Sequence, residues 1–178
     1  MSSPKTSSTA PNGARRSRSS GDIFKNILGS AFGLGLLPVA PGTFGALLGL
    51  AWHLAALSAG LSGLALRGAC LAGALLWSAV HYALTPWAQA YWNDSDPGHF
   101  VLDEVVGYLC VPLLSLETHD LRLVLLGFLL VRVFDIIKLP GARYIDRNIH
   151  TASGVLFDDV VSAVYAAAAL SLVIVLRA

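Results

Sequence analysis

The stretch GACLAGALLWSAVHYALTPWAQAYWN, residues 68–93, contains no Asp, Glu, Lys or Arg. Two further runs share this property, residues 27–66 and residues 160–176. A helix that crosses the hydrocarbon core of a bilayer needs roughly 20 predominantly apolar residues. Runs of this kind, separated by short charged segments, predict an all-α protein in which several helices cross a membrane.

The composition agrees with this prediction. The chain has 178 residues, of which 55% are hydrophobic and 13% are charged, and its mean hydropathy is +0.66. An average soluble domain carries about 25% charged residues. We therefore expect one small membrane domain over residues 22–178. Its two cysteines, Cys70 and Cys110, lie far apart in apolar surroundings, which predicts buried thiols and neither a disulfide framework nor a zinc site.

The pattern predicts a bundle of about four to five transmembrane helices and one shorter segment. Residues 27–37 are too few to cross a bilayer, are rich in Gly and end in Pro38-Val39-Ala40-Pro41. They predict an interfacial or re-entrant piece. The expected helices cover residues 43–58, 63–84, 101–116, 121–138 and 159–176.

The N-terminal arm, residues 1–21, has a different composition. It is rich in Ser, Pro and Gly, which favours disorder, because such a segment buries too little apolar area to offset its ordering entropy. Five of the 12 basic residues lie in the first 25 positions. By the positive-inside rule, this excess of basic residues places the N-terminus in the cytoplasm.

Threading the expected helices from a cytoplasmic N-terminus assigns each loop to one side of the membrane. The loops at residues 85–100 and 139–158 fall on the cytoplasmic side, and those at 59–62 and 117–120 on the opposite side. Every large acidic cluster then lies at the cytoplasmic surface. Because charge beside a membrane span is costly, such a cluster is by default a candidate functional site.

Five carboxylates dominate this side, each near the end of an expected helix. Clustered oxygen ligands suit hard cations, and Mg²⁺ in particular binds through one or two carboxylates together with the phosphate oxygens of a substrate. The sequence therefore predicts a magnesium site whose metal ligands come from Asp103, Glu104, Asp135, Asp158 and Asp159.

Basic and hydroxyl side chains accompany the carboxylates. Arg132 and Asp135 are three residues apart and share a helix face, and Lys138 lies one turn further. Arginine suits bidentate recognition of phosphate, and lysine acts as a point charge. Thr43 is expected to cap a helix whose free N–H groups would form an anion site.

Each of these features also has a purely structural interpretation. The acidic pairs could simply complement helix dipoles, and Arg132 with Asp135 could be a structural ion pair. His53 and His81 occupy apolar helix positions and are interpreted as helix-interface residues. It is the joint pattern that favours a site over these alternatives.

Four segments, in this order and spacing, resemble the phosphatidylglycerophosphatase A family. They are LPVAPGTFG at residues 37–45, VLDEVVG at 101–107, RVFDIIK at 132–138 and DRNIH at 146–150, followed by Gly154 and the Asp158-Asp159 pair. The resemblance covers roughly residues 25–175. The chain departs from the family pattern after Lys138, where it has Leu139-Pro140-Gly141, and before Gly154, where it has Thr151-Ala152-Ser153.

The resemblance implies a multi-pass enzyme of the bacterial inner membrane, with its active site on the cytoplasmic side. Such an enzyme uses Mg²⁺ to remove the terminal phosphate of phosphatidylglycerophosphate, which yields phosphatidylglycerol. Its expected partner is this phospholipid, and no nucleic acid is expected. Carried over by position, the catalytic candidates are Asp103, Glu104, Asp135 and Asp159, and the substrate-binding candidates are Lys138, Arg132, Thr43 and His150.

The favoured mechanism is metal-assisted hydrolysis without a covalent intermediate, and Glu104 and Asp159 both remain open as the general base. The run Asp94-Ser95-Asp96 imitates the start of phosphatases that form an aspartyl phosphate, but no strand precedes it, so it is interpreted as peripheral. A transporter or scaffold that binds an ion or an anionic headgroup without turnover is the alternative function. The expected one-sided placement of the charges disfavours a transport path. The oligomeric state and the number of metal ions stay open.

Overall fold

The computed structural model describes residues 19–177, and these residues form helices and no strand. The predicted all-α class is confirmed. The elements are α1 (Ser20–Gly29), the short 3-10 helix η1 (Leu34–Leu36), α2 (Pro41–Ser58), α3 (Gly63–Trp92), α4 (Leu102–Leu114), α5 (Leu121–Ile137), α6 (Pro140–Asn148) and α7 (Ala152–Arg177).

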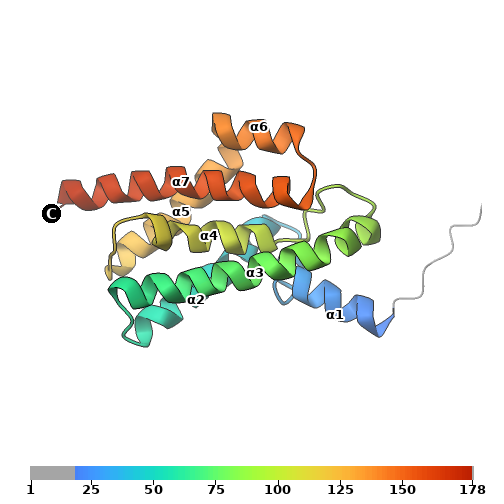
Figure 1. Ribbon diagram of the computed structural model, residues 1–178, viewed down its shortest axis with the longest axis horizontal. Helices are drawn as coiled ribbons and strands as arrows, with labels where there is room; N and C mark the ends of the chain where they lie inside the picture. The colour runs from blue at the N-terminus through green and yellow to red at the C-terminus, as the bar shows by residue number, and fades with distance from the viewer. Residues whose placement is uncertain (1–18, 178) are drawn as a thin grey trace, which may run out of the picture.

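The long helices form an up-and-down bundle with α4 at its centre (Figure 1). Helix α4 packs against α2, α3 and α7, and α5 packs mainly against α7. One whole face of α4 is buried, including Leu102, Val105 and Leu109. The core of the bundle therefore surrounds α4, with α2, α3 and α7 packed directly on it and α5 held mainly through α7.

Small residues allow the backbones to approach α4 closely. A Cβ atom at Gly45 of α2 would lie 2.6 Å from the Cβ of Val101, and one at Gly49 would lie 2.8 Å from the carbonyl oxygen of Val105. Both distances are too short for a real side chain. The Gly-x-x-x-Gly spacing thus brings α2 directly against α4, as such spacing does between membrane helices.

Three of the five expected helices, at residues 43–58, 101–116 and 121–138, match α2, α4 and α5 to within two residues at each end. The other two are longer than expected. Helix α3 continues through Pro86 to Trp92, where stacking of Trp87 on Tyr91 and the edge contacts of Trp92 support its last turns. Helix α7 begins at Ala152, so the Asp158-Asp159 pair lies in its second turn and not at its start.

Two helices were not expected. Helix α6 follows α5 almost directly because Pro140 occupies its first turn, a position that proline favours. Helix α1 begins within the expected N-terminal arm, of which residues 1–18 lie outside the described part of the chain. Residues 27–37 form the end of α1, a reversal with positive φ at Ala31, Phe32 and Gly33, and η1.

Asp22 joins α1 to the bundle. The Ser19 hydroxyl accepts a hydrogen bond from the Asp22 backbone N–H, and the Asp22 side chain accepts one from the Ser19 backbone N–H, which makes a capping box. Asp22 Oδ1 also accepts a hydrogen bond of 2.9 Å from Trp87 Nε1 in α3. One side chain therefore both caps α1 and holds it against α3.

We expect Asp22→Ala to lower the free energy of unfolding by about 1 kcal/mol, because loss of a helix cap typically costs this much. Asp22→Asn, which keeps an acceptor oxygen for one of the two partners, should lose less. Thermal melts of the purified variants in detergent measure the difference. Equal melting temperatures for Asp22→Ala and the wild type would contradict this role.

Two helices within residues 19–177, α3 and α7, are long and apolar enough to cross a membrane. Helices α4 and α5 have 13 and 17 residues, or roughly 20 and 26 Å, against a hydrocarbon thickness of about 30 Å. The expected count of four to five crossing helices therefore stays a prediction.

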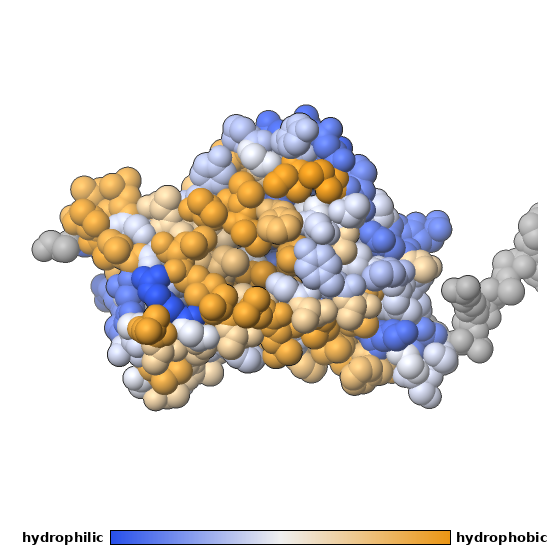
Figure 2. All heavy atoms as spheres, in the orientation of Figure 1, coloured by the Kyte–Doolittle hydropathy of each residue, from blue (hydrophilic) through white to orange (hydrophobic). Residues whose placement is uncertain are grey.

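Figure 2 shows apolar residues over much of the bundle's face and hydrophilic residues over α6 and the end near α1.

Candidate active site

The acidic residues meet in one cavity at the end of the bundle where α4 and α7 begin and α5 ends. Its volume is about 250 Å³. All five predicted carboxylates reach it, which confirms that the charged clusters lie together at one end. The lining residues are Asp96, Gly98, Phe100, Asp103, Glu104, Asp135, Ile136, Lys138, Val155, Asp158 and Asp159.

The first turn of α4 supplies Asp103 and Glu104. Each has one buried oxygen, Asp103 Oδ1 and Glu104 Oε2, that lacks a hydrogen-bond partner within residues 19–177. One turn further, Gly107 faces α7, where a Cβ atom would lie 3.1 Å from the Cβ of Asp159. The absence of a side chain at Gly107 thus lets Asp159 approach the α4 carboxylates.

Three carboxylates form the most compact group in the cavity. Asp135 in the last turn of α5 and the Asp158-Asp159 pair in α7 each offer an oxygen, and these oxygens lie within 4.8 Å of one another. All three residues are at least nine-tenths buried. Asp159 Oδ2 has no hydrogen-bond partner in the described part of the chain.

These residues fit a hard divalent cation. Buried carboxylates at such short separations repel one another unless a positive charge lies between them. Oxygen atoms are also the donors that Mg²⁺ prefers. The compact group and the unpartnered oxygens of Asp103, Glu104 and Asp159 supply such donors. Two nearby cations already engage two members of the group, Arg132 with Asp135 and Lys138 with Asp158, whereas Asp159 has no ion-pair partner within residues 19–177.

Lys138 lies on the cavity wall and links α6 to α7. It ends α5 with a left-handed backbone, φ 49°, and its Nζ donates to Asp146 Oδ1 at 2.6 Å and to Asp158 Oδ2. Burial disfavours the charged amine, but the two carboxylates outweigh this effect and raise the pKa of Lys138 above its usual value. Lys138 therefore carries its charge at the site.

Arg132, predicted to bind substrate, is outside the set of residues that line the cavity. Its Nη1 is 3.0 Å from Asp135 Oδ2, and its Nη2 is 3.7 Å from Glu104 Oε1. Its Nε donates to Thr43 Oγ1 at 3.3 Å. The structural ion pair between Arg132 and Asp135, weighed above as an alternative, is therefore present.

Thr43 does not cap its helix. Helix α2 begins at Pro41, its N-cap residue is Ala40 in a left-handed conformation, and no side chain caps it. Thr43 thus lies within the first turn, where its hydroxyl accepts from Arg132. The prediction of a cap was wrong because Pro41 can start a helix two residues earlier.

Three further residues differ from expectation. His150 is exposed in the connection between α6 and α7 and is outside the set that lines the cavity. Asp96, interpreted above as peripheral, lies at the cavity wall on the exposed loop after α3. Pro97 and Gly98 follow Asp96 and interrupt any helix that would link it to Asp103, so only the fold of this loop reveals its position at the cavity. Asp146 was likewise not assigned a role, and it holds Lys138.

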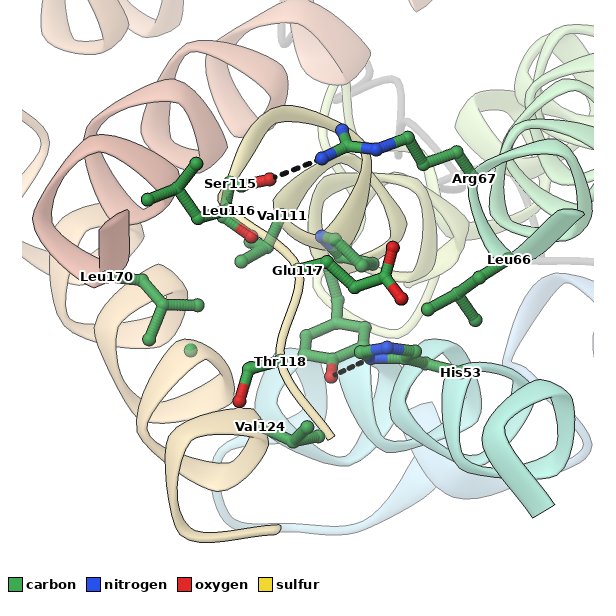
Figure 3. Close-up of a pocket in the computed structure, with 13 residues that line it drawn as sticks. His53, Leu66, Arg67, Val111, Ser115, Leu116, Glu117, Thr118, Val124 and Leu170 are labelled. Atoms are coloured by element: carbon green, nitrogen blue, oxygen red, sulfur yellow. Dashed lines mark hydrogen bonds between the residues drawn. The ribbon is translucent and has the colours of Figure 1, made fainter. Parts of the chain in front are cut away.

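A second pocket lies near the other end of the bundle (Figure 3). Here His53 Nδ1 and the Tyr108 hydroxyl are 3.0 Å apart, and Arg67 donates to the carbonyl oxygens of Leu113 and Ser115. Its volume of about 20 Å³ has room for about one water molecule. With Glu117 as its one carboxylate among the lining residues, this pocket does not resemble a phosphate or metal site.

The other histidine and the cysteines also have structural positions. His81 Nε2 lies 3.0 Å from the carbonyl oxygen of Ala152, which joins α3 to the start of α7. The interpretation of His53 and His81 as helix-interface residues agrees with these contacts. Cys70 is buried and Cys110 half-buried, and both thiols are free.

Comparison with known proteins places this arrangement in a family. The family model described as Phosphatidylglycerophosphatase A matches residues 27–174, which include every helix from α2 to α6 and most of α7. The chain belongs to this family. The predicted identity as a family member, and with it the prediction of an enzyme, is confirmed.

Individual relatives agree with this membership. A Phosphatidylglycerophosphatase A of Escherichia coli is 31% identical over 151 residues, which cover 80% of this chain and 78% of the relative. One of Haemophilus influenzae is 32% identical over 145 residues, or 79% of this chain and 83% of the relative. A protein of Bacteroides thetaiotaomicron with the provisional name phosphatidylinositol-3-phosphatase is 35% identical over 150 residues, or 78% and 86%. No solved structure matches this member of the family.

Proposed function

We propose that this protein hydrolyses the terminal phosphate of phosphatidylglycerophosphate to give phosphatidylglycerol, with Mg²⁺ as its cofactor. The observation that carries the proposal is the cavity lined by Asp103, Glu104, Asp135, Asp158 and Asp159, three of which hold buried oxygens without partners within residues 19–177. Family membership and two relatives of that name support the choice of substrate.

The chemistry follows from the residues on the cavity wall. Mg²⁺ bound there would polarise the phosphoryl oxygens and lower the pKa of a bound water. Asp135, Asp158 and Asp159 would hold it. Lys138 lies on the same wall, and its ammonium group would stabilise negative charge that builds up on the phosphoryl group.

A carboxylate of the same cavity would accept the proton of the attacking water. Glu104 and Asp159 are the candidates, because each has an unpartnered oxygen among the described residues and each lines the cavity. An attack by water needs no covalent intermediate on the protein.

We further propose that the bundle crosses the bacterial inner membrane several times, with the N-terminus and the cavity on the cytoplasmic side. The apolar surface of α3 and α7 supports membrane insertion. The loop between α4 and α5 lies at the opposite end of the bundle from the cavity (Figure 1). A headgroup phosphate would then enter at the membrane surface, while the acyl chains stay in the bilayer.

Labelling of single cysteines tests this topology. We expect a membrane-impermeant maleimide added to the periplasmic side to label His119→Cys, in the loop between α4 and α5, but not His99→Cys, near the cavity. Both positions are exposed, so each should react once the membrane is permeabilised. Labelling of His99→Cys in intact cells would contradict the proposed orientation.

Phosphate release from purified protein in mixed micelles tests the substrate. We expect faster release from phosphatidylglycerophosphate than from phosphatidylinositol 3-phosphate, the substrate suggested by the name of the Bacteroides relative. Faster release from the inositol lipid would replace the proposed substrate with that one. No release from either lipid, in a well-folded sample, would refute the proposed hydrolysis of these lipids.

A further inference from the structure

Three helices converge on the guanidinium group of Arg132. Its contacts are Thr43 from α2 at 3.3 Å, Glu104 from α4 at 3.7 Å and Asp135 from its own helix α5 at 3.0 Å. Arg132 is 8% exposed. All three of its nitrogens thus face protein side chains, and a substrate phosphate would have to displace buried carboxylates to reach it.

Gly42 completes this group. A Cβ atom at Gly42 would collide with Glu104 Oε1, and it would lie 2.6 Å from Glu104 Cδ and 2.8 Å from Arg132 Nη2. The Glu104 carboxylate therefore occupies the space that a side chain at residue 42 would need. It also lies at the N-terminus of α2, where the helix dipole favours a negative charge.

The two oxygens of Glu104 consequently have different surroundings. Oε1 is directed to Gly42 and Arg132, while Oε2 has no hydrogen-bond partner among residues 19–177. Glu104 itself lines the cavity. Arg132 similarly engages Oδ2 of Asp135, which leaves Oδ1 of this carboxylate for other partners.

We propose that Gly42, Thr43 and Arg132 form a positioning unit that fixes one oxygen of Glu104 and one of Asp135 and thereby aims the other oxygen of each into the cavity. Arg132 is then a positioning residue and not a phosphate ligand. The proposal rests on the function proposed above, since it assigns this unit to the same site. It also gives the Pro-Gly-Thr segment at the start of α2 a role in the reaction.

The first test couples Gly42 to Glu104. Gly42→Ala should lower kcat about 10²-fold, since a displacement of about 1 Å at a site can cost this much. In a Glu104→Asp background the shorter side chain leaves room for the added methyl group, so the same change should lower kcat by a much smaller factor. The melting temperature should show the same coupling, because the clash also strains the fold.

Gly45→Ala is the matched control. It adds a methyl group one turn away on the same helix, but there the clash is with Val101. Its effect on melting temperature should be equal in both backgrounds. Equal effects of Gly42→Ala in both backgrounds would overturn the proposal. If the wild type releases no phosphate, the proposal for the substrate is refuted. The melting temperatures alone still show whether Gly42 and Glu104 are coupled.

The second test addresses the hydroxyl of Thr43. Thr43→Val keeps the shape of the side chain but removes the acceptor for Arg132 Nε, and it should lower kcat about tenfold with little change in the lipid KM. Thr43→Ser retains the hydroxyl and should restore kcat. A rise in KM with unchanged kcat in Thr43→Val would instead indicate direct substrate binding and would overturn the positioning role.

Discussion

Asp159→Asn is expected to lower the turnover of phosphatidylglycerophosphate about 10³-fold, because it would remove several kcal/mol of transition-state stabilisation by the proposed Mg²⁺. Asp159 belongs to the compact group with Asp135 and Asp158, and it has an unpartnered oxygen within the described residues. An amide at this position has the same shape but no charge. The protein should therefore stay folded while it loses activity.

Asp120→Asn provides the matched control. Asp120 caps α5 at the other end of the bundle, where its side chain accepts from the Arg122 backbone N–H at 2.8 Å. Asparagine caps helices about as well as aspartate, so this variant should keep both activity and stability. Phosphate release and a melting curve are measured for each protein. Near-normal turnover in Asp159→Asn would show that the compact group does not hold the catalytic cation.

Arg132→Ala is expected to have the largest effect on stability, a loss of about 3–5 kcal/mol. Losses of this size are typical when one partner of a buried ion pair is removed and the other charge stays behind. Here two buried or nearly buried carboxylates, on Glu104 and Asp135, would lose their neighbouring cation. Because both lie on the cavity, activity should fall as well.

Arg122→Ala is the comparison for Arg132→Ala on the same helix. Arg122 is exposed at the start of α5, so its substitution should change the free energy of unfolding by no more than about 0.5 kcal/mol. Unfolding by denaturant in detergent measures both variants. Equal stability of Arg132→Ala and Arg122→Ala would mean that Arg132 does not hold the carboxylates together.

The sequence predicted the location of the acidic site because helix direction alternates along the chain. Asp103 follows the loop at residues 85–100. Two helices later, Asp135 lies just before the loop at residues 139–158, and the Asp158-Asp159 pair lies at the end of that loop. An up-and-down bundle therefore brings all of them to the same end. This argument needs only the order of the apolar runs. The cavity confirms it for all five carboxylates.

The partners of the basic residues could not be predicted in the same way. Periodicity shows that Arg132 shares a face with Asp135, but it gives no sign that Gly42 and Glu104 meet beside its guanidinium group. The link from Lys138 to Asp146 likewise depends on α6, a nine-residue helix with few apolar residues. Helix α1 was missed because its capping box lies inside a Ser-rich segment that is typical of disorder.

The central claim is that the carboxylate cavity binds Mg²⁺ and hydrolyses a lipid phosphate. The most direct measurement is phosphate release from phosphatidylglycerophosphate by metal-stripped protein during titration with Mg²⁺, in the wild type and in Asp159→Asn. We predict no release without the metal, saturable recovery in the wild type, and little or no recovery in the variant. Release that persists in excess chelator and is equal in the two proteins would contradict the claim.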